Sequence, residues 1–396
     1  MGGERRMSYE FYNPTRVLFG AEQLNHLHEQ KMPGKKAMLV ISNGKSTRAS
    51  GALDRTMKEL SLAGVEVVLY DKVGANPVKE IVEEGGHFAK KEGCDFIVAL
   101  GGGSVMDAAK VMAMYAQQPG DLWDYVAGAT GKQQPLVNPV LPVIAITTTA
   151  GTGSEVDQWG VVTNPATNEK IGCGGMDELF PVIAVVDPEL MLTVPSKFTA
   201  YQGFDALFHS VEGYLSVVNS PMSEMVQLAA IENIGTYLPR AVKDGSDLEA
   251  REHVAFANTM SGYSMVVGSC TSEHSMEHAM SAFHPALPHG AGLIMISVEY
   301  YRHFIEKHCC DERFVRMAQA LGMKDAKAPE DFITALKKLQ EDCGVSDLKM
   351  SDYGIEKEES MVLARNAKAT MGGLFACDPV PMTDEECAAI YEKSYR

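Results

Sequence analysis

Short apolar segments alternate with amphipathic ones through the first half of the chain, and this alternation limits the possible fold most strongly. Five apolar runs of strand length cover residues 37–41, 65–70, 96–100, 143–146 and 182–186. Helical patterns fall between or after them, at 51–62, 78–92 and 105–116. Strand runs separated by helical segments are typical of a parallel sheet that is covered on both faces. We therefore expect an α/β domain here.

The pattern changes near residues 188–196, where Pro188 and Pro195 interrupt the chain. Beyond this point strand-like runs become scarce, and helical periodicity covers 205–215, 223–237 and 249–267. A length of 396 residues is long for one hydrophobic core, so two domains are expected. The sequence predicts an α/β domain over 1–192 and an all-helical domain over 193–396. Ligand sites prefer the cleft between two such domains.

Charge and composition exclude several classes of partner. A formal net charge of −17 argues against nucleic acid, which requires a basic surface. No apolar run approaches the roughly 20 residues that span a bilayer, and the N-terminus lacks the apolar stretch of a signal peptide. The eight cysteines include no C-x-x-C pair, which favours free thiols in a reducing compartment. We expect a cytoplasmic protein that binds neither membranes nor nucleic acid.

A glycine run, 101–103, lies between the third apolar run and a helical segment. Glycines in this position let the chain turn tightly and direct the N–H groups of the helix start at an anion such as a pyrophosphate. A plain tight turn gives the same letters, but the strand before and the helix after favour the phosphate interpretation. The run does not match G-x-G-x-x-G, and other strand–helix units precede it. We therefore expect a Rossmann-like nucleotide domain without the ordinary fingerprint.

Two further loops follow predicted strands. The loop at 147–155 is rich in hydroxyls and small residues that suit contact with a dinucleotide, although helix capping would use the same residues. The loop at 42–48 contains Lys45, Ser46 and Arg48 but no carboxylate. Basic and hydroxyl groups accommodate a ribose 2′-phosphate, so NADP(H) is favoured, while Asn43 keeps NAD(H) possible.

Histidines and one aspartate form a candidate metal site. Asp205 and His209 lie four residues apart in a helical pattern and so share one face, and His274 and His278 repeat this spacing. His289 follows a turn-like segment. Three imidazoles and one carboxylate suit a divalent metal, either Fe²⁺ or Zn²⁺, and leave a position for substrate.

Two neighbouring residues are interpreted differently. His284 lies between Phe283 and Pro285, and we predict that it is not a ligand but lies near the mouth of the pocket. Glu212, three residues after His209, is predicted to be structural, with contact to a ligand or to solvent as the alternatives.

With these motifs the sequence resembles the iron-containing (group III) alcohol dehydrogenase family. The similarity runs from about residue 11 to about residue 300. The stretches that carry it are Gly101–Lys110, Thr147–Glu155, Gly203–His209, Glu212–Ser216 and His274–Gly290. The family shares its two-domain architecture with dehydroquinate-synthase-like proteins.

The resemblance implies a role for each matching position. The metal ligands are Asp205, His209, His274 and His289. The segment from His274 to His289 is one residue longer than usual, so His284 stays an alternative for the fourth ligand. His278 matches a histidine near the nicotinamide, acting either as proton relay or as orienting residue. The cofactor positions are Gly102, Gly103, Ser104 and Asp107 for the pyrophosphate, Thr148, Thr149 and Thr152 for the nicotinamide, Lys170 for the ribose, and Ser42, Asn43, Gly44 and Ser46 in a loop that resembles NADPH-using members.

The implied function is a metal-dependent, NAD(P)-linked alcohol dehydrogenase or aldehyde reductase. Such an enzyme transfers hydride between nicotinamide C4 and a small primary alcohol or aldehyde, which here could be polar or anionic. We expect Gln158, Trp159 and residues near Cys270 to line the substrate pocket, and a homodimer by analogy. The alternative is a dehydroquinate-synthase-like lyase or cyclase, which uses metal and NAD without net oxidation.

Overall fold

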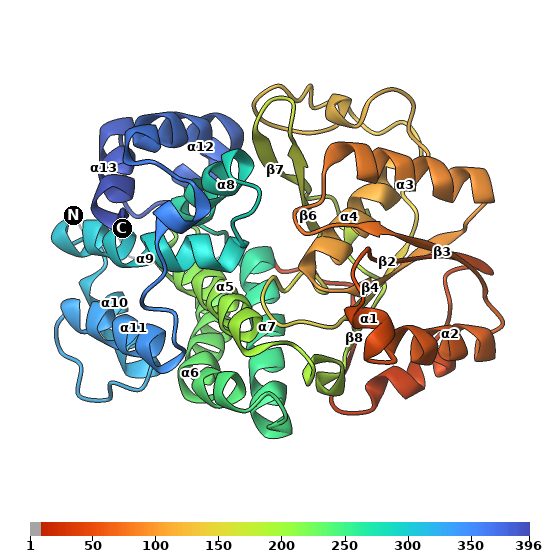
Figure 1. The fold of residues 1–396 in the computed structure, drawn as a ribbon, viewed down its shortest axis with the longest axis horizontal. Helices are drawn as coiled ribbons and strands as arrows, with labels where there is room; N and C mark the ends of the chain where they lie inside the picture. Colours follow the sequence, from red (N-terminus) through yellow and green to blue (C-terminus); the bar gives the residue numbers. More distant parts are fainter. Residues whose placement is uncertain (1–8) are drawn as a thin grey trace.

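The computed structural model describes residues 9–396, and its first half is built on a six-stranded parallel sheet (Figure 1). The strand order is β1-β8-β5-β4-β2-β3. The strands are β1 Arg16–Phe19, β2 Lys36–Ser42, β3 Glu66–Val73, β4 Phe96–Gly101, β5 Val143–Thr147 and β8 Ile183–Val186. All five apolar runs are strands, which confirms the predicted α/β half, while β1 was not anticipated.

Helices cover both faces of this sheet, as its continuous apolar strands require. Side chains alternate along β2, so that Leu39 packs toward one face and Met38 toward the other. The 3-10 helix η1 Gln23–Glu29 and α2 Ala52–Leu62 cover the first face. The second is covered by α3 Lys79–Glu92 and α4 Gly103–Tyr115. The short helix α1 Ser46–Ala49 follows β2.

A small antiparallel hairpin projects from the sheet half toward the helical half. It consists of β6 Trp159–Asn164 and β7 Glu169–Gly174, which the sequence analysis did not predict. Strand β7 packs against α8 and α12 of the helical half. The hairpin thus brings residues of the first half to the boundary with the second.

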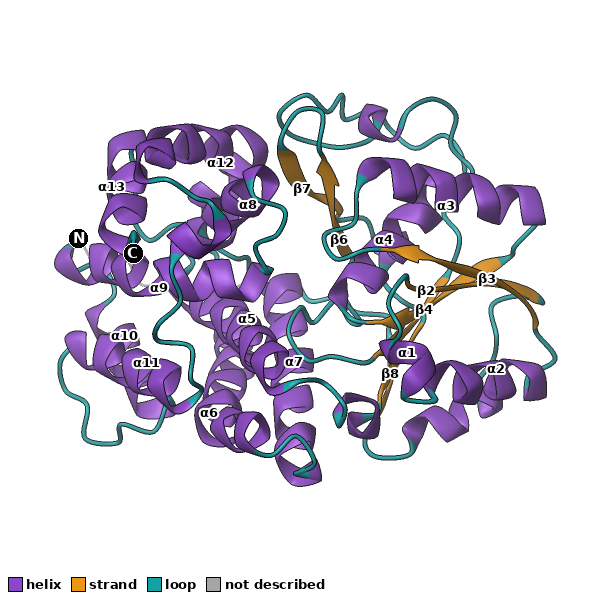
Figure 2. Ribbon diagram, viewed as in Figure 1, coloured by secondary structure: helices purple, strands orange, loops and turns teal. Residues whose placement is uncertain are grey.

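The second half is helical throughout, and no strand follows Val186 within the described part of the chain. Figure 2 shows this separation of strands and helices. The helices are α5 Ser196–Leu215, α6 Pro221–Lys243, α7 Leu248–Val267, α8 Ser272–Phe283, α9 His289–Glu306, α10 Asp311–Ala320, α11 Glu330–Asp342, α12 Ser360–Phe375 and α13 Asp384–Ser394. The remaining 3-10 turns are η2 Leu122–Asp124, η3 Asp177–Leu179, η4 Pro188–Met191, η5 Met350–Tyr353 and η6 Lys357–Glu359.

These helices pack around one core, and α5 runs through its centre. Almost every residue of α5 from Thr199 onward is buried. Polar side chains on this helix are therefore removed from water and need partners within the protein. Across residues 9–396, no helix combines the length and apolar character that crossing a membrane requires.

Candidate active site

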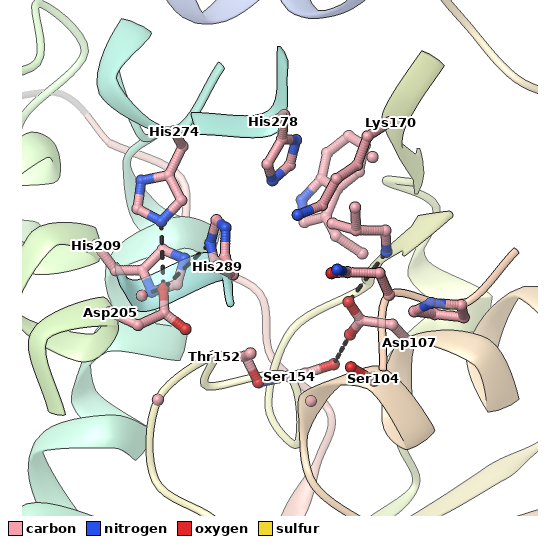
Figure 3. A pocket seen from close by; sticks show the side chains of 18 of the residues that line it. Ser104, Asp107, Thr152, Ser154, Lys170, Asp205, His209, His274, His278 and His289 are labelled. Atoms are coloured by element: carbon pink, nitrogen blue, oxygen red, sulfur yellow. Dashed lines mark hydrogen bonds and ion pairs between the residues drawn. The ribbon is translucent and has the colours of Figure 1, made fainter. Parts of the chain in front are cut away.

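A cavity of about 790 Å³ lies between the two halves of the chain. Its walls come from the carboxyl ends of β2 and β4, from the hairpin, and from α5, α8 and α9. Figure 3 shows a group of imidazoles on one side of this space and Ser104, Asp107 and Ser154 on the other. In open parallel sheets, ligands bind outside the carboxyl ends of the strands, and the cavity lies in that position here.

The metal-site candidates converge at the helical side of the cavity. Asp205 and His209 lie one turn apart on α5, His274 lies on α8, and His289 begins α9. Asp205 Oδ1 lies 3.4 Å from each of three imidazole nitrogens, namely His209 Nδ1, His274 Nε2 and His289 Nε2. The predicted set of four side chains is therefore brought together by three helices.

This geometry fits a divalent cation. Ligands at about 2.1 Å from one tetrahedrally coordinated ion are about 3.4 Å from each other, which is the separation of Asp205 Oδ1 from the three nitrogens. His209 Nδ1 is also buried and has no hydrogen-bond partner among the described residues. A buried polar atom without a partner is unusual, and a cation bound at this nitrogen would satisfy it.

Two buried carboxylates orient the ligand imidazoles. Glu212 accepts hydrogen bonds from His274 Nδ1 and, at 3.1 Å, from the His274 backbone N–H. Glu277 accepts from His289 Nδ1 and lies 3.4 Å from Lys170 Nζ, which also bonds Ser281 Oγ at 2.8 Å. Ligating histidines generally donate their other N–H to a carboxylate in this way.

The charges in this cluster favour the ligand forms of two of the side chains. Burial opposes ionisation of Asp205, but its interactions with the neighbouring imidazoles, first His209 and then His289, together with hydrogen bonds from His274 and His289, outweigh it and hold the pKa of the carboxyl well below its usual value. Burial, together with the neighbouring His274, lowers the pKa of His209 to about 3. Asp205 is therefore an anion and His209 a neutral imidazole at physiological pH, which are the forms that bind metals.

The glycine run forms the opposite wall. A Cβ atom on Gly102 would lie 2.8 Å from Thr149 Oγ1, and one on Gly103 would lie 2.2 Å from Thr152 Cγ2. Glycine is therefore needed at both positions for the 147–152 loop to pack against the start of α4. The first N–H groups of a helix have no partners within it, and such groups are typical binding sites for anions.

Most of the remaining cofactor candidates line the cavity. Besides Gly102, Gly103, Thr149 and Thr152, these are Ser42, Ser46, Ser104, Asp107 and Lys170. Asp107 accepts hydrogen bonds from Ser154 Oγ at 2.6 Å and from the Val161 N–H at 3.1 Å. It therefore also ties α4 to the start of the hairpin.

Three cofactor candidates are not among the residues that line the cavity, namely Asn43, Gly44 and Thr148. Asn43 and Gly44 are exposed in the loop after β2, and the Asn43 N–H donates to the Val73 carbonyl at 2.8 Å. The Thr148 N–H donates to the Gly101 carbonyl at 2.9 Å. In the same loop region, Arg48 pairs with Asp71 of β3 at 2.7 Å.

His278 lies between the imidazole group and Lys170 (Figure 3). It is buried, and its ring centroid lies 5.3 Å from that of His289. Its Nδ1 lies 2.9 Å from Met371 Sδ. Met371 reaches this position because its backbone leaves helical geometry inside α12, at φ −134° and ψ 43°. Burial and then the Lys170 charge hold the pKa of His278 well below its usual value, so the ring is neutral.

The family model for iron-containing alcohol dehydrogenase matches residues 14–188, and the model for the C-terminal part of Fe-containing alcohol dehydrogenases matches residues 199–395. The chain belongs to the iron-containing alcohol dehydrogenase family. The two models divide the chain where the sheet half meets the helical half.

Relatives within the iron-containing alcohol dehydrogenase family match nearly the whole chain. It is 32% identical to the 1,3-propanediol dehydrogenase of Klebsiella pneumoniae, over 98% of this chain and 100% of that protein. It is 38% identical to the choline dehydrogenase of Bacillus subtilis, over 81% of this chain and 78% of that protein. Its structure matches an archaeal halo-thermophilic alcohol dehydrogenase from a Red Sea brine pool with a TM-score of 0.93 and 34% identity, over 99% and 100% of the two chains.

Some details of this member of the iron-containing alcohol dehydrogenase family differ from the sequence-based interpretation. His284 does not line the cavity, and its Nε2 lies 3.0 Å from a Glu359 carboxylate oxygen. Trp159 and Cys270 line the cavity as expected, but Gln158 does not. Glu212 is fully buried and accepts a hydrogen bond from the candidate ligand His274, which is one of the alternatives that the sequence left open.

Two contributors were missed by the sequence analysis, namely Glu277 and Met371. A signal for Glu277 was present, since it lies three residues after His274 in a helical pattern and so can share its face. No sequence signal marked Met371, because its place depends on a local break in helical geometry.

Proposed function

We propose that this protein is a metal-dependent, NAD(P)H-linked alcohol dehydrogenase that interconverts a small primary alcohol and its aldehyde. One observation carries the proposal: the candidate metal ligands and the glycine loop face the same cavity. A hydride donor held by the loop would thus lie beside a substrate oxygen held at the imidazole group.

In this proposal the chain's own residues divide into a metal half and a cofactor half. Asp205, His209, His274 and His289 hold one divalent cation, Fe²⁺ or Zn²⁺. The cofactor is held by Gly102, Gly103, Ser104 and Asp107 around the pyrophosphate, by Thr148, Thr149 and Thr152 near the nicotinamide, by Lys170 at the ribose, and by Ser42, Asn43, Gly44 and Ser46 at the adenosine end. When bound, the metal acts as a Lewis acid on the substrate oxygen and the nicotinamide carries the hydride.

His278 is the candidate for moving the proton of the alcohol. With Nδ1 directed at the Met371 sulfur, a weak acceptor, Nε2 stays available as a base. The lowered pKa keeps this nitrogen unprotonated at neutral pH, so it can accept a proton from the hydroxyl of a bound alcohol.

The apolar side chains in the cavity wall favour an uncharged substrate. The wall includes Trp159, Phe198, Met265 and Leu374. Lys170 is the one Lys or Arg among the cavity-lining residues identified between residues 9 and 396, and its ammonium group is engaged by Glu277 and Ser281. An anionic substrate would therefore find no free cation in the wall. We infer a short, uncharged primary alcohol or aldehyde as substrate.

The decisive experiment mixes the purified protein with a panel of short aldehydes and with NADH or NADPH in separate series. Net loss of the reduced cofactor, matched by formation of the alcohol, supports the dehydrogenase. Turnover of a substrate with no net change in the cofactor would instead support the dehydroquinate-synthase-like lyase or cyclase. A charged aldehyde bearing a sulfonate or carboxylate belongs in the panel, because preference for it contradicts the inferred substrate class.

We further propose that the protein is a homodimer that joins through the β1 edge of the sheet. No strand within residues 9–396 pairs with the outer side of β1. Tyr9, Tyr12 and Phe19 beside it are 58%, 52% and 38% exposed, and exposed aromatic clusters next to an open strand edge favour association. Sedimentation at several concentrations tests this proposal, and a monomer throughout would contradict it.

A further inference from the structure

Cys270 lies in the short loop between α7 and α8, close to the candidate metal ligands. The residue is 8% exposed and lines the cavity. Its Sγ lies within 4.8 Å of a ring nitrogen of His209 and of one of His274. The metal ligands described above therefore have a sulfur atom as a near neighbour.

The same side of the group contains a buried nitrogen that has no partner in the protein. His209 is 6% exposed, and its Nδ1 has no hydrogen-bond partner within residues 9–396. His209, which carries this nitrogen, belongs to the same set of three side chains as Cys270. A cation in this position would satisfy the nitrogen and contact the sulfur.

The donor atoms form two overlapping triads that share His274. One contains Asp205, His274 and His289, and the other contains His209, Cys270 and His274. A sulfur and a nitrogen that bind one ion at neighbouring positions are about 3.6 Å apart. The donor atoms of the second triad lie within 4.8 Å of one another. The thiol therefore has to move by about 1 Å to reach the separation of bound ligands, and a rotation of the Cys270 side chain provides this movement.

We propose that Cys270 is a further ligand of the catalytic cation in the substrate-free enzyme. Its thiolate binds from the cavity side, in the position that the substrate oxygen takes during turnover. On binding, the thiol releases its proton to solvent as the metal–sulfur bond forms, and no electron is transferred. Thiolate is a softer ligand than oxygen or nitrogen. A site that includes it therefore binds Zn²⁺ and Co²⁺ more tightly than a site of oxygen and nitrogen ligands alone.

This inference rests on the proposed function, because it assumes that the four predicted ligands hold a cation. Cobalt separates the two ideas, since Co²⁺ gives visible ligand-field bands in a four- or five-coordinate site and a near-ultraviolet charge-transfer band only when sulfur is bound. The full-length protein is stripped with a chelator, dialysed and reloaded with Co²⁺ without substrate. We expect both kinds of band in the unsubstituted protein.

Two variants complete the test. In Cys270→Ser the near-ultraviolet band is lost while the visible bands remain, and these visible bands show that the variant still folds its metal site. Cys94→Ser, which changes a buried thiol in the sheet half, keeps both bands. Visible bands without the near-ultraviolet band in the unsubstituted protein, or survival of that band in Cys270→Ser, would overturn the role of Cys270 alone. Failure of the unsubstituted protein to bind Co²⁺ would overturn the metal site itself.

Discussion

Replacement of Glu277 by Gln tests whether the buried carboxylates behind the imidazoles prepare the site for a cation. Glu277 is fully buried on α8, and His289 Nδ1 and Lys170 Nζ both face its carboxylate. Burial opposes its charge, but His289 and Lys170 outweigh this effect and lower the pKa of the carboxyl. The substitution keeps the shape of the side chain and removes the negative charge.

The expected losses of metal affinity and of stability follow from the two side chains that would lose the Glu277 carboxylate as a partner. Loss of a carboxylate that orients a ligating histidine weakens metal binding about 10–100-fold, which is about 1.4–2.7 kcal/mol. Lys170 also loses its counter-ion, and breaking a buried ion pair from one side costs about 3–5 kcal/mol of stability. Because Lys170 keeps its bond to Ser281, we expect the lower end of that range.

Metal affinity is measured by competition with a chromogenic chelator, and thermal unfolding of the metal-free protein is followed separately. Glu273→Gln is the matched control, since Glu273 is equally buried on α8 but accepts a hydrogen bond from Tyr301. Burial and then Glu212 raise the pKa of Glu273 well above its usual value, so Gln resembles its neutral form. Metal affinity within about threefold of the unsubstituted protein in Glu277→Gln, or equal losses in both variants, would refute the reasoning.

Three further predictions concern the proton, the cofactor and pH. His278→Ala should lower turnover by about 10²–10⁴-fold while metal content stays near one ion per chain, and loss of the metal would make His278 a ligand instead. If Arg48 binds the ribose 2′-phosphate, Arg48→Ala should raise the KM for NADPH about tenfold and leave the KM for NADH unchanged. Equal effects on the KM values of both cofactors would contradict this role. Burial raises the pKa of Asp107 from 3.8 to about 6, so its ionisation destabilises the folded state as pH rises through that interval. The melting temperature of Asp107→Asn relative to the unsubstituted protein should therefore rise across this interval and level off above it, and a constant difference would exclude the effect.

Continuous apolar runs made most of the sheet predictable. Runs such as 96–100 are buried on both faces, and burial of this kind leaves an unambiguous sequence pattern. Strand β1 and the hairpin escaped prediction because only part of the residues in each strand are apolar. Lys170 lies on the hairpin strand β7, which was not predicted. Its position beside the helical half therefore could not be inferred from the sequence.

The metal ligands were predictable because helical spacing places Asp205 and His209 on one face of α5. Which of His284 and His289 completes the set depends on where α9 begins and how it packs, and only His289 approaches Asp205. Glu277 could not be separated by sequence from an ordinary solvent-facing glutamate. Its burial results from packing of α8 against α9 and β7, which no local pattern encodes.

The most direct test of the central claim measures metal content and aldehyde reduction on the same preparation. Chelator-treated protein is assayed before and after reloading with Fe²⁺ or Zn²⁺, alongside Asp205→Asn. We predict loss of activity in step with removal of one ion per chain, recovery on reloading, and neither binding nor recovery in the variant. Full activity in protein shown to contain no metal would contradict the claim that Asp205, His209, His274 and His289 hold the catalytic cation.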